Sequence, residues 1–314
     1  MTKVLGDSNR LQKGTTVATI GMFDGVHLGH LTLIAELKRI AAERGLQTAV
    51  ITFAQHPQAV LRPDSDIRML MSVDDKVAEI SRQGIDNVVL LNFTYELSLN
   101  NSRQFMQLLR DRYGVAVLVA GYDHRFGHDK TETFADYVSH GKELGIDIMK
   151  APEYLGEYAP VSSSIIRRLI ASGKVDDAYR CMGHPYTLRG TVVHGFHNGR
   201  GIGFPTANVG NLDPTLILPH NGAYAVMVEV AGQRLQGMVN VGVRPTLQNG
   251  PQLTIEVNIF DFEDDIYGQP ITLEFIKFLR LEFKLGSIEE LRAQLTRDRS
   301  RSREILSAHE GGRA

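Results

Sequence analysis

Residues 16–45, TVATIGMFDGVHLGHLTLIAELKRIAAERG, decide the fold of the first half of the chain. The opening TVATIGMF (16–23) is a short apolar run, which predicts a buried strand. Residues 31–45 carry apolar side chains three and four positions apart, which predicts an amphipathic helix. A strand that leads through a glycine-containing turn into a helix is typical of a parallel α/β sheet.

The same alternation continues to about residue 122. Further apolar runs predict buried strands at 49–53, 87–93 and 115–122. Further amphipathic stretches predict helices at 74–84 and 102–114. Ser72, three residues before Asp75, resembles the capping box that begins a helix. Strands that alternate with helices predict an α/β doubly wound, Rossmann-like sheet, whose ligands bind beyond the carboxyl ends of the strands.

The pattern changes near residue 184, where His184-Pro185 interrupts any helix. Short strand-like runs follow at close spacing, at 187–193, 223–230, 234–243, 253–262 and 270–278. Asn221-Gly222, Ala231-Gly232 and Asn249-Gly250 are turn signals between such runs. These features predict a small antiparallel β-barrel. A closing helix is expected to begin at Ser287, with Glu290 completing a capping box, and to run toward Ile305. We therefore expect two domains, 1–183 and 184–314.

Composition excludes several classes of protein. The chain has 314 residues, enough for two domains, and is 43% hydrophobic with a formal net charge of -2. It lacks the basic excess of a duplex nucleic-acid binder. Its single cysteine, Cys181, excludes an internal disulfide framework and suits a reducing cytoplasm. Neither a signal peptide nor an apolar run of membrane-spanning length is found, so we expect a cytoplasmic protein without membrane or nucleic-acid partners.

The turn GMFDGVHLGH (21–30) carries candidate phosphate chemistry. Asp24-Gly25 makes the turn, His27 and His30 stand one helical turn apart, and Gly29 leaves space above the helix terminus. Free N–H groups and the helix dipole favour a polyphosphate there, and two imidazoles can donate to charge developing on an attacked phosphorus. For an isolated pair of histidines, simple capping of the helix is the more frequent interpretation.

A second glycine-rich segment, residues 195–208, precedes the strands of the barrel. Its glycines would let backbone amides surround phosphate groups, although a flexible hairpin tip is the more frequent explanation of such a run. Thr206 and Asn208 carry oxygens two residues apart that could reach one Mg²⁺ ion. Other histidines predict no zinc site, because no Cys/His cluster has ligand spacing and the pair His124/His128 is weak evidence.

These motifs together resemble a known family. GMFDGVHLGH (21–30), ITFAQHP (51–57), VAGYDHRFG (119–127), VSSSIIRRLIASGKV (161–175) and GFPTAN (203–208) resemble segments of prokaryotic bifunctional riboflavin kinase/FAD synthetases. The resemblance spans roughly residues 16 to 305. It implies that the C-terminal domain phosphorylates riboflavin and that the N-terminal, nucleotidyltransferase domain adenylylates FMN. The implied small molecules are riboflavin, FMN, FAD and ATP with Mg²⁺, without a tightly bound cofactor.

The resemblance also implies roles for residues of the adenylyltransferase site. His27 and His30 would be catalytic. ATP and its phosphates would be bound by Gly21, Phe23, Asp24, Gly29, Asp123, Ser163, Ser164 and Arg167. From the residues alone, the serines and Arg167 could equally be an ordinary N-cap and a solvated arginine. Met22 and Ser164 replace the asparagine and threonine that are common in the family.

The kinase site is implied in the same way. Glu256 would be the catalytic base, although its position in an alternating strand also suits a solvent-facing carboxylate. Gly195, Gly201, Gly203 and Thr206 would bind ATP, and Thr206 and Asn208 would hold Mg²⁺. Flavin contacts are implied for Arg280, Asp298 and Arg303.

Two other functions stay open at this stage. One activity could have been lost while the other is retained, although both sets of motifs are intact. A non-catalytic flavin-binding, storage or regulatory protein is also compatible with a flavin site. The sequence predicts neither the oligomeric state nor the preference for oxidised or reduced flavin. The products formed from riboflavin, ATP and Mg²⁺ would separate these possibilities.

Overall fold

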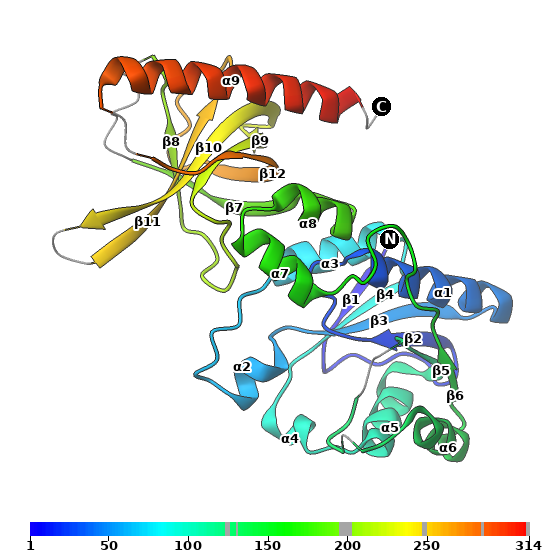
Figure 1. The fold of residues 1–314 in the computed structure, drawn as a ribbon. Coiled ribbons are helices and arrows are strands. Elements are labelled where there is room, and N and C mark those ends of the chain that lie inside the picture. The colour runs from blue at the N-terminus through cyan, green and yellow to red at the C-terminus, as the bar shows by residue number, and fades with distance from the viewer. Residues whose placement is uncertain (123–125, 130, 195–202, 247–249, 284–285, 312–314) are drawn as a thin grey trace. The chain divides into compact units, whose positions relative to one another are not determined.

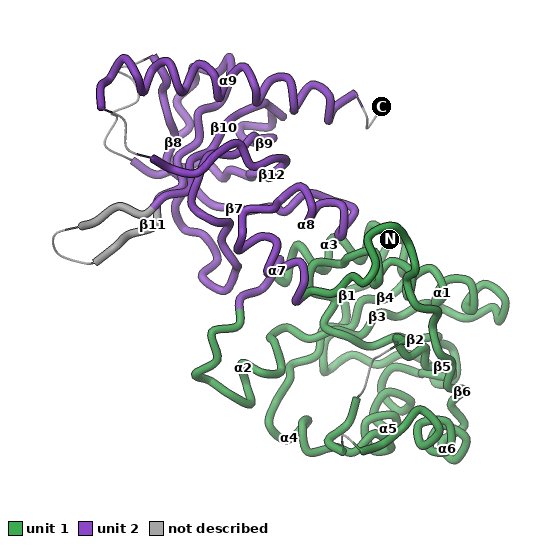
Figure 2. Tube along the Cα trace, in the orientation of Figure 1, with its two compact units in different colours: residues 1–67, 72–163 green, residues 68–71, 164–314 purple. Residues whose placement is uncertain are grey.

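The computed structural model describes residues 1–122, 126–129, 131–194, 203–246, 250–283 and 286–311. The chain forms two compact units, which Figure 2 shows in different colours. The first comprises residues 1–67 and 72–163, and the second comprises residues 68–71 and 164–314. The predicted division into domains 1–183 and 184–314 stays a prediction.

A six-stranded parallel sheet forms the centre of the first unit (Figure 1), which confirms the predicted doubly wound sheet. Its order is β1-β4-β3-β2-β5-β6. The strands are β1 (Lys3–Leu5), β2 (Thr16–Ile20), β3 (Gln47–Phe53), β4 (Asn87–Leu91), β5 (Val115–Ala120) and β6 (Asp147–Lys150). All residues of β2 are buried, because a central parallel strand is covered on both faces. The short strands β1 and β6 at the two edges were not predicted.

Six helices are described in the first unit, namely α1 (Leu28–Arg44), α2 (Pro57–Leu61), α3 (Val73–Arg82), α4 (Tyr95–Ser98), α5 (Ser102–Tyr113) and α6 (Phe134–Leu144). Ser72 caps α3 as predicted, since its Oγ accepts the N–H of Asp75 at 3.1 Å. Figure 1 places α1 and α3 on one face of the sheet and α5 and α6 on the other.

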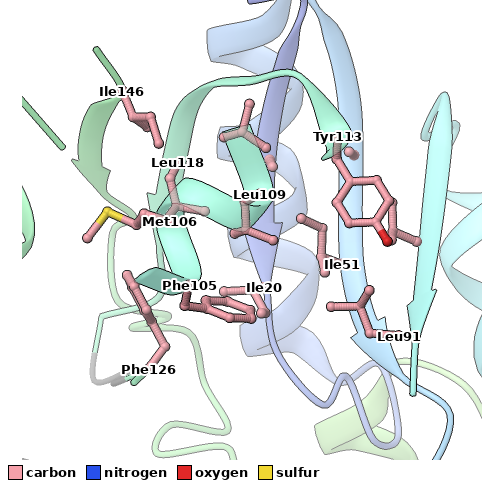
Figure 3. Packing of buried hydrophobic residues seen from close by; sticks show 14 of the residues in the cluster. Ile20, Ile51, Leu91, Phe105, Met106, Leu109, Tyr113, Leu118, Phe126 and Ile146 are labelled. Carbon is pink, nitrogen blue, oxygen red and sulfur yellow. The ribbon is translucent and has the colours of Figure 1, made fainter. Parts of the chain in front are cut away.

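The core beneath α5 joins that helix to the sheet. Phe105, Met106 and Leu109 of α5 pack against Ile20 and Ile51 of the central strands, as Figure 3 shows. The cluster takes every second residue of each strand, such as Ala18 and Ile20 of β2, and residues three to four positions apart on the helix. The two periodicities therefore place one apolar face of each element against the other.

The second unit contains a closed barrel in the order β10-β11-β8-β7-β12-β9, with neighbouring strands antiparallel. The strands are β7 (Tyr186–Val193), β8 (Ala207–Gly210), β9 (Gly222–Val230), β10 (Gln233–Thr246), β11 (Gly250–Ile259) and β12 (Pro270–Arg280). The helices are α7 (Ser163–Ala171), α8 (Val175–Met182) and α9 (Ile288–Gly311). The predicted barrel and closing helix are confirmed.

The turn predicted at Ala231-Gly232 connects β9 to β10. Ala231 and Gly232 adopt left-handed backbone angles, with φ of 52° and 73°, as a two-residue type I′ turn requires. Asn249 of another predicted turn lies outside the described residues. At the start of α9, Ser287 Oγ accepts the N–H of Glu290 at 3.1 Å, and the Glu290 carboxylate accepts the N–H of Gly286 at 2.8 Å.

The strands of the barrel have two apolar faces. Tyr224, Val226 and Phe275 are wholly buried and fill the barrel. Ala225 and Met227, which alternate with them, form with Met238 and Leu306 of α9 a second buried cluster. The helix α9 therefore covers part of the outer face of the barrel. Within the described part of the chain, no helix is long and apolar enough to cross a membrane.

Candidate active sites

The loop that joins β2 to α1 is fixed along its main chain. The N–H of Gly21 donates to the carbonyl of Ile51 at 3.1 Å, and the hydroxyl of Thr52 donates to the carbonyl of Met22 at 3.0 Å. The hydroxyl of Ser163 donates to the carbonyl of Asp24 at 2.8 Å. The loop is thus bonded to the end of β3 and to Ser163, both within the first unit.

Phe23 and Val26 of this loop adopt left-handed backbone angles, with φ of 50° and 34°. Non-glycine residues rarely adopt such angles, and each costs of order 1–3 kcal/mol that the surroundings must offset. Both side chains, and that of Asp24 between them, are wholly buried. Strained backbone of this kind gathers at ligand sites, so the loop is a candidate site on its geometry alone.

His27 and His30 lie together at the start of α1. His27 is the N-cap, and its Nδ1 accepts the N–H of His30 at 3.4 Å. The two rings stack with centroids 3.7 Å apart, and the ring of Phe23 lies 4.9 Å from that of His30. A Cβ at Gly29 would lie 3.2 Å from the His27 ring, so glycine leaves room for the imidazole.

The cap determines which nitrogen of His27 carries the proton. Because Nδ1 accepts a hydrogen bond, the ring proton of the neutral imidazole lies on Nε2. His27 therefore caps the helix through Nδ1, and the proton of its neutral ring lies on the other nitrogen, Nε2. Capping and ligand binding, which the sequence presents as alternatives, are compatible in this geometry.

An apolar pocket of about 480 Å³ adjoins the loop at Gly21 and Met22. It lies at the carboxyl ends of β2 and β3, where a doubly wound sheet binds its ligands. The aromatic residues that line it are Phe53, Phe93, Tyr95, Phe105 and Phe126. The rings of Phe53 and Phe93 meet edge to face at 5.4 Å. Sequence reasoning missed these residues, because they are scattered over several segments and carry no polar motif.

The remaining residues predicted for this site have different positions. Ser163 belongs to the first unit and bonds to the loop, whereas Ser164 and Arg167 lie on α7 within the second unit. Asp123 lies outside the described residues.

In the second unit, Glu256 lies between two asparagines of neighbouring strands. It is directly opposite Asn208 of β8 and directly opposite Asn240 of β10. Such cross-strand partners have Cβ atoms about 4.5–5.5 Å apart, so the three side chains form one polar row. Glu256 is half-buried and shares the outer face of the barrel with Met238, which packs toward α9.

Asn240 and Glu282 extend this row and were not predicted. Asn240 Nδ2 donates to Glu282 Oε1 at 3.1 Å. A Cβ at Gly242 would lie 2.9 Å from the same oxygen, so this glycine leaves room for the carboxylate. The row therefore continues from Asn240 to a second acidic group, Glu282. Spacing in the sequence could not reveal it, because the residues belong to different strands.

Thr206 lies immediately before β8 and borders a pocket of about 310 Å³. The pocket is lined by Val192, Pro205, Thr206, Ala207, Val257, Ile259, Phe262, Glu263, Asp264, Asp265, Ile266 and Tyr267. Asn258 Nδ2 donates to the carbonyl of Pro205 at 2.7 Å and holds this segment to β11. Gly203 has a φ of 80°, which favours glycine. Gly195 and Gly201 lie outside the described residues.

The donor set around Asn208 suits a hard cation. Thr206, Asn208 and Glu256 offer hydroxyl, amide and carboxylate oxygens, the ligand types that Mg²⁺ prefers. Within the described ranges, no group of three or more His, Cys, Asp or Glu side chains could hold a metal ion.

Arg280, Asp298 and Arg303 connect α9 to the barrel. Arg280 Nε donates to Asp298 Oδ2 at 2.9 Å, and Asp298 is 5% exposed. Arg303 donates to both carboxylate oxygens of Asp261 at 2.8 Å, and its guanidinium lies 5.2 Å from the Phe260 ring centroid.

Both halves of the chain match known protein families. Residues 9–165 match the FAD synthetase family, and residues 182–306 match the riboflavin kinase family. The chain is 35% identical to the bifunctional riboflavin kinase/FMN adenylyltransferase of Listeria monocytogenes, over 93% of this chain and 92% of that protein. The protein of the same name from Bacillus subtilis is 37% identical, over 92% of each chain.

A similar chain is also found among solved structures. The crystal structure of a macrolide-efflux protein from Streptococcus pneumoniae has a TM-score of 0.87 and 29% identity, covering 96% of this chain and 98% of that chain. The same two-unit fold therefore occurs in a solved structure. Together with the two family matches and the bacterial relatives, this places the chain in the family of bifunctional riboflavin kinase/FMN adenylyltransferases.

Proposed function

We propose that the adenylylation of FMN takes place at the β2–α1 loop, with the polyphosphate of ATP at the N-terminus of α1. The protein also phosphorylates riboflavin, and both reactions use ATP. The isoalloxazine ring of FMN would occupy the adjoining aromatic pocket. The observation that supports this assignment is the contact of one pocket with both the loop and a set of aromatic side chains. A flat ring system suits aromatic walls, and an anion suits a helix N-terminus.

The proposed chemistry is an in-line displacement. A phosphate oxygen of FMN attacks the α-phosphorus of ATP, a P–O bond forms, and the bond to pyrophosphate breaks. The FMN phosphate is already an anion, so the site needs no base. Its task is to stabilise the charge that develops on phosphorus oxygens, and Nε2–H of His27 is a suitable donor. His30, stacked on His27, would donate beside it.

For riboflavin phosphorylation we propose Glu256 as the base. It would accept the proton of the terminal ribityl hydroxyl while that oxygen attacks the γ-phosphorus of ATP and ADP leaves. The row formed by Asn208, Glu256 and Asn240 supports this assignment, because it places the carboxylate beside a candidate ligand of the cation. The pocket beside Thr206 is the proposed place for ATP, whose phosphates Gly195, Gly201 and Gly203 would approach.

Mg²⁺ is the proposed cation, with Thr206 and Asn208 as its protein ligands. When bound, it would neutralise charge on the phosphates of ATP. Arg280, Asp298 and Arg303 were expected to contact flavin, and that role stays a prediction. Their ion pairs also support a structural role between α9 and the barrel. We extend the proposal to a cytoplasmic location, where ATP is available, and to small molecules as the partners.

The test uses two substrate mixtures and chromatography of the flavins. Riboflavin with ATP and Mg²⁺ should yield FMN and then FAD, and FMN with ATP and Mg²⁺ should yield FAD. Tyr95→Ala should raise KM for FMN in the second mixture and leave KM for riboflavin unchanged. Tyr95 is 61% exposed, so its truncation should leave the core intact. If one mixture gives no flavin product, the corresponding activity has been lost. If KM for FMN is unchanged in Tyr95→Ala, the flavin binds outside the aromatic pocket.

A further inference from the structure

Phe126 lines the aromatic pocket from a segment that belongs to no helix or strand. Its side chain is 8% exposed, and its ring centroid lies 6.1 Å from that of Phe105 on α5 (Figure 3). Within a regular element, repeated hydrogen bonds fix the backbone, but a connecting segment needs other partners for its buried N–H and C=O groups. The position of this wall of the pocket therefore depends on contacts with neighbouring elements.

Tyr137 of α6 supplies such contacts. Its hydroxyl accepts the N–H of Phe126 at 3.3 Å and donates to the carbonyl of the same residue at 3.1 Å. The two rings also stack, with centroids 4.4 Å apart and planes inclined by 21°. Tyr137 is only 2% exposed, so its hydroxyl is shielded from water. One buried side chain therefore holds both the backbone and the ring of Phe126.

The next two residues, Gly127 and His128, also line the pocket and are held at the start of α5. The N–H of His128 donates to the carbonyl of Asn100 at 2.8 Å. Gly127 has a φ of 93°, and a Cβ there would lie 2.6 Å from the backbone nitrogen of Ser102, so this close approach requires glycine. The segment is thus attached to α5 through Gly127 and His128, and to α6 through Tyr137.

We propose that Tyr137 is a positioning residue for FMN in the adenylylation reaction. Among the described residues that line the pocket, none belongs to α6, so Tyr137 acts on the flavin through Phe126. It holds the Phe126 ring in the wall against which the isoalloxazine ring stacks, and it takes no part in the phosphate chemistry at the β2–α1 loop. The inference rests on the flavin pocket proposed above. Its signature is an effect on KM for FMN that kcat and KM for ATP do not share.

The experiment compares Tyr137→Phe with Tyr113→Phe in the full chain. Tyr113 is a matched control, because it belongs to the same buried cluster and its hydroxyl also donates to a backbone carbonyl, that of Gly6, at 3.3 Å. It is wholly buried and is not among the described residues that line the pocket. Each substitution removes one buried hydroxyl and keeps the ring, so the two variants should lose comparable stability. FAD formation from FMN and ATP is followed by chromatography, at a temperature at which circular dichroism shows each variant to be folded.

Loss of the Tyr137 hydroxyl removes both hydrogen bonds to Phe126 and lowers the fraction of molecules in which its ring is in place. The apparent affinity for FMN falls by the same fraction. Because the two hydrogen bonds are together worth about a tenfold change in such an equilibrium, KM for FMN should rise on the order of tenfold in Tyr137→Phe. We expect kcat and KM for ATP to stay nearly unchanged, and Tyr113→Phe to keep all three constants. KM for riboflavin should be that of the parent protein in both variants, because the proposed kinase site lies in the other unit.

A double variant tests whether Tyr137 acts through Phe126. Phe126→Leu should itself raise KM for FMN, because it removes one aromatic wall of the pocket. If the two residues act as one unit, the increase in Tyr137→Phe/Phe126→Leu should fall short of the product of the two single increases. Tyr137→Leu, which loses the stacked ring as well as the hydroxyl, should raise KM for FMN more than Tyr137→Phe does.

The inference is overturned if Tyr137→Phe has the same KM for FMN as Tyr113→Phe, or if the increases at Tyr137 and Phe126 multiply. It is also overturned if kcat falls while KM for FMN stays unchanged, because Tyr137 would then act on the reaction rather than on flavin binding. Failure of the pocket itself is a separate outcome: Phe126→Leu and Tyr95→Ala would then both leave KM for FMN unchanged. In that case the flavin binds elsewhere, and the inference about Tyr137 falls together with the proposed site.

Discussion

The proposed adenylyltransferase site is made from a turn, whereas the proposed kinase site is made from the face of a sheet. His27 and His30 lie three residues apart, and a single helix N-terminus brings them together. Asn208, Glu256 and Asn240 come from three strands that only the barrel places side by side. The first site is therefore encoded locally, and the second depends on strand register.

The two sites also differ in how they are held. The β2–α1 loop contains left-handed residues and is bonded at several points, so its conformation depends on its surroundings. The polar row of Asn208, Glu256 and Asn240 lies within regular antiparallel ladders. Hydrogen bonds between the strands fix the backbone position from which each of these side chains projects. This contrast suits the chemistry, because adenylylation needs donors arranged around a phosphate, while phosphorylation of a hydroxyl needs one base beside the cation.

The largest expected effect is at Glu256. Glu256→Gln keeps the shape of the side chain but cannot accept a proton, so riboflavin phosphorylation should fall by roughly 10²–10⁴. The same variant supplied with FMN and ATP should make FAD at a near-normal rate. Rates of FMN and FAD formation by chromatography check both statements. If Glu256→Gln has the kinase activity of the parent protein, another residue is the base, and Glu282 would be the first candidate.

At His27, two substitutions can separate capping of α1 from catalysis. His27→Ala removes both the cap and the imidazole, whereas His27→Asn replaces the cap with a favoured capping residue. Because the loss of one donor to a transition state costs about 10²–10³ in rate, both variants should slow FMN adenylylation by that factor.

His30→Ala should lose a similar amount, and riboflavin phosphorylation should continue in all three variants. Activity retained in His27→Asn but lost in His27→Ala would mean that His27 serves only to cap α1. Equal loss of both reactions would indicate a folding defect rather than a catalytic one.

A smaller effect is expected at the boundary between the two activities. We expect residues 184–314 alone to phosphorylate riboflavin, because the proposed base, cation ligands and ATP pocket lie in this span. However, α8 packs on β12 and β7 with Val175, Ala178 and Met182 buried, and Asp176 pairs with Lys277.

Fragment 184–314 should thus be less stable than 164–314, by roughly 1.5–3 kcal/mol for each large apolar side chain that loses its partner. Urea unfolding of the two fragments measures the difference. A folded 184–314 that makes no FMN would contradict the predicted boundary, and equal stability would mean that α8 contributes little to the barrel.

The smallest effect is expected at Arg303. Its pair with Asp261 is solvent-exposed, so Arg303→Ala should lower the free energy of unfolding by less than about 1 kcal/mol. If the pair is purely structural, KM for riboflavin should not change. A selective increase of KM for riboflavin, with unchanged unfolding, would instead support the flavin contact that the family resemblance implies.

The pattern of residues along the chain was enough to predict the fold classes of both units, and it supplied the candidate residues of the proposed site at the β2–α1 loop. Strands such as β2 are buried on both faces and read as continuous apolar runs, and Ala231-Gly232 supplies the backbone angles that a tight hairpin needs. The edge strands β1 and β6 escaped prediction because both are short and each includes exposed polar residues, Lys3 and Asp147 among them. Their pairing comes from neighbouring strands rather than from their own pattern.

What lies around these residues depends on how distant segments of the chain pack together. Packing brought scattered aromatic side chains into one pocket beside Gly21, placed Asn240 opposite Glu256 and within hydrogen-bond distance of Glu282, and buried Lys76 against the end of β3. None of these neighbours has a characteristic spacing along the chain. Helix ends and turns are determined by residues a few positions apart, so their chemistry can be read from the sequence. Pockets and buried charge pairs depend on contacts between distant segments, which form only when the chain packs.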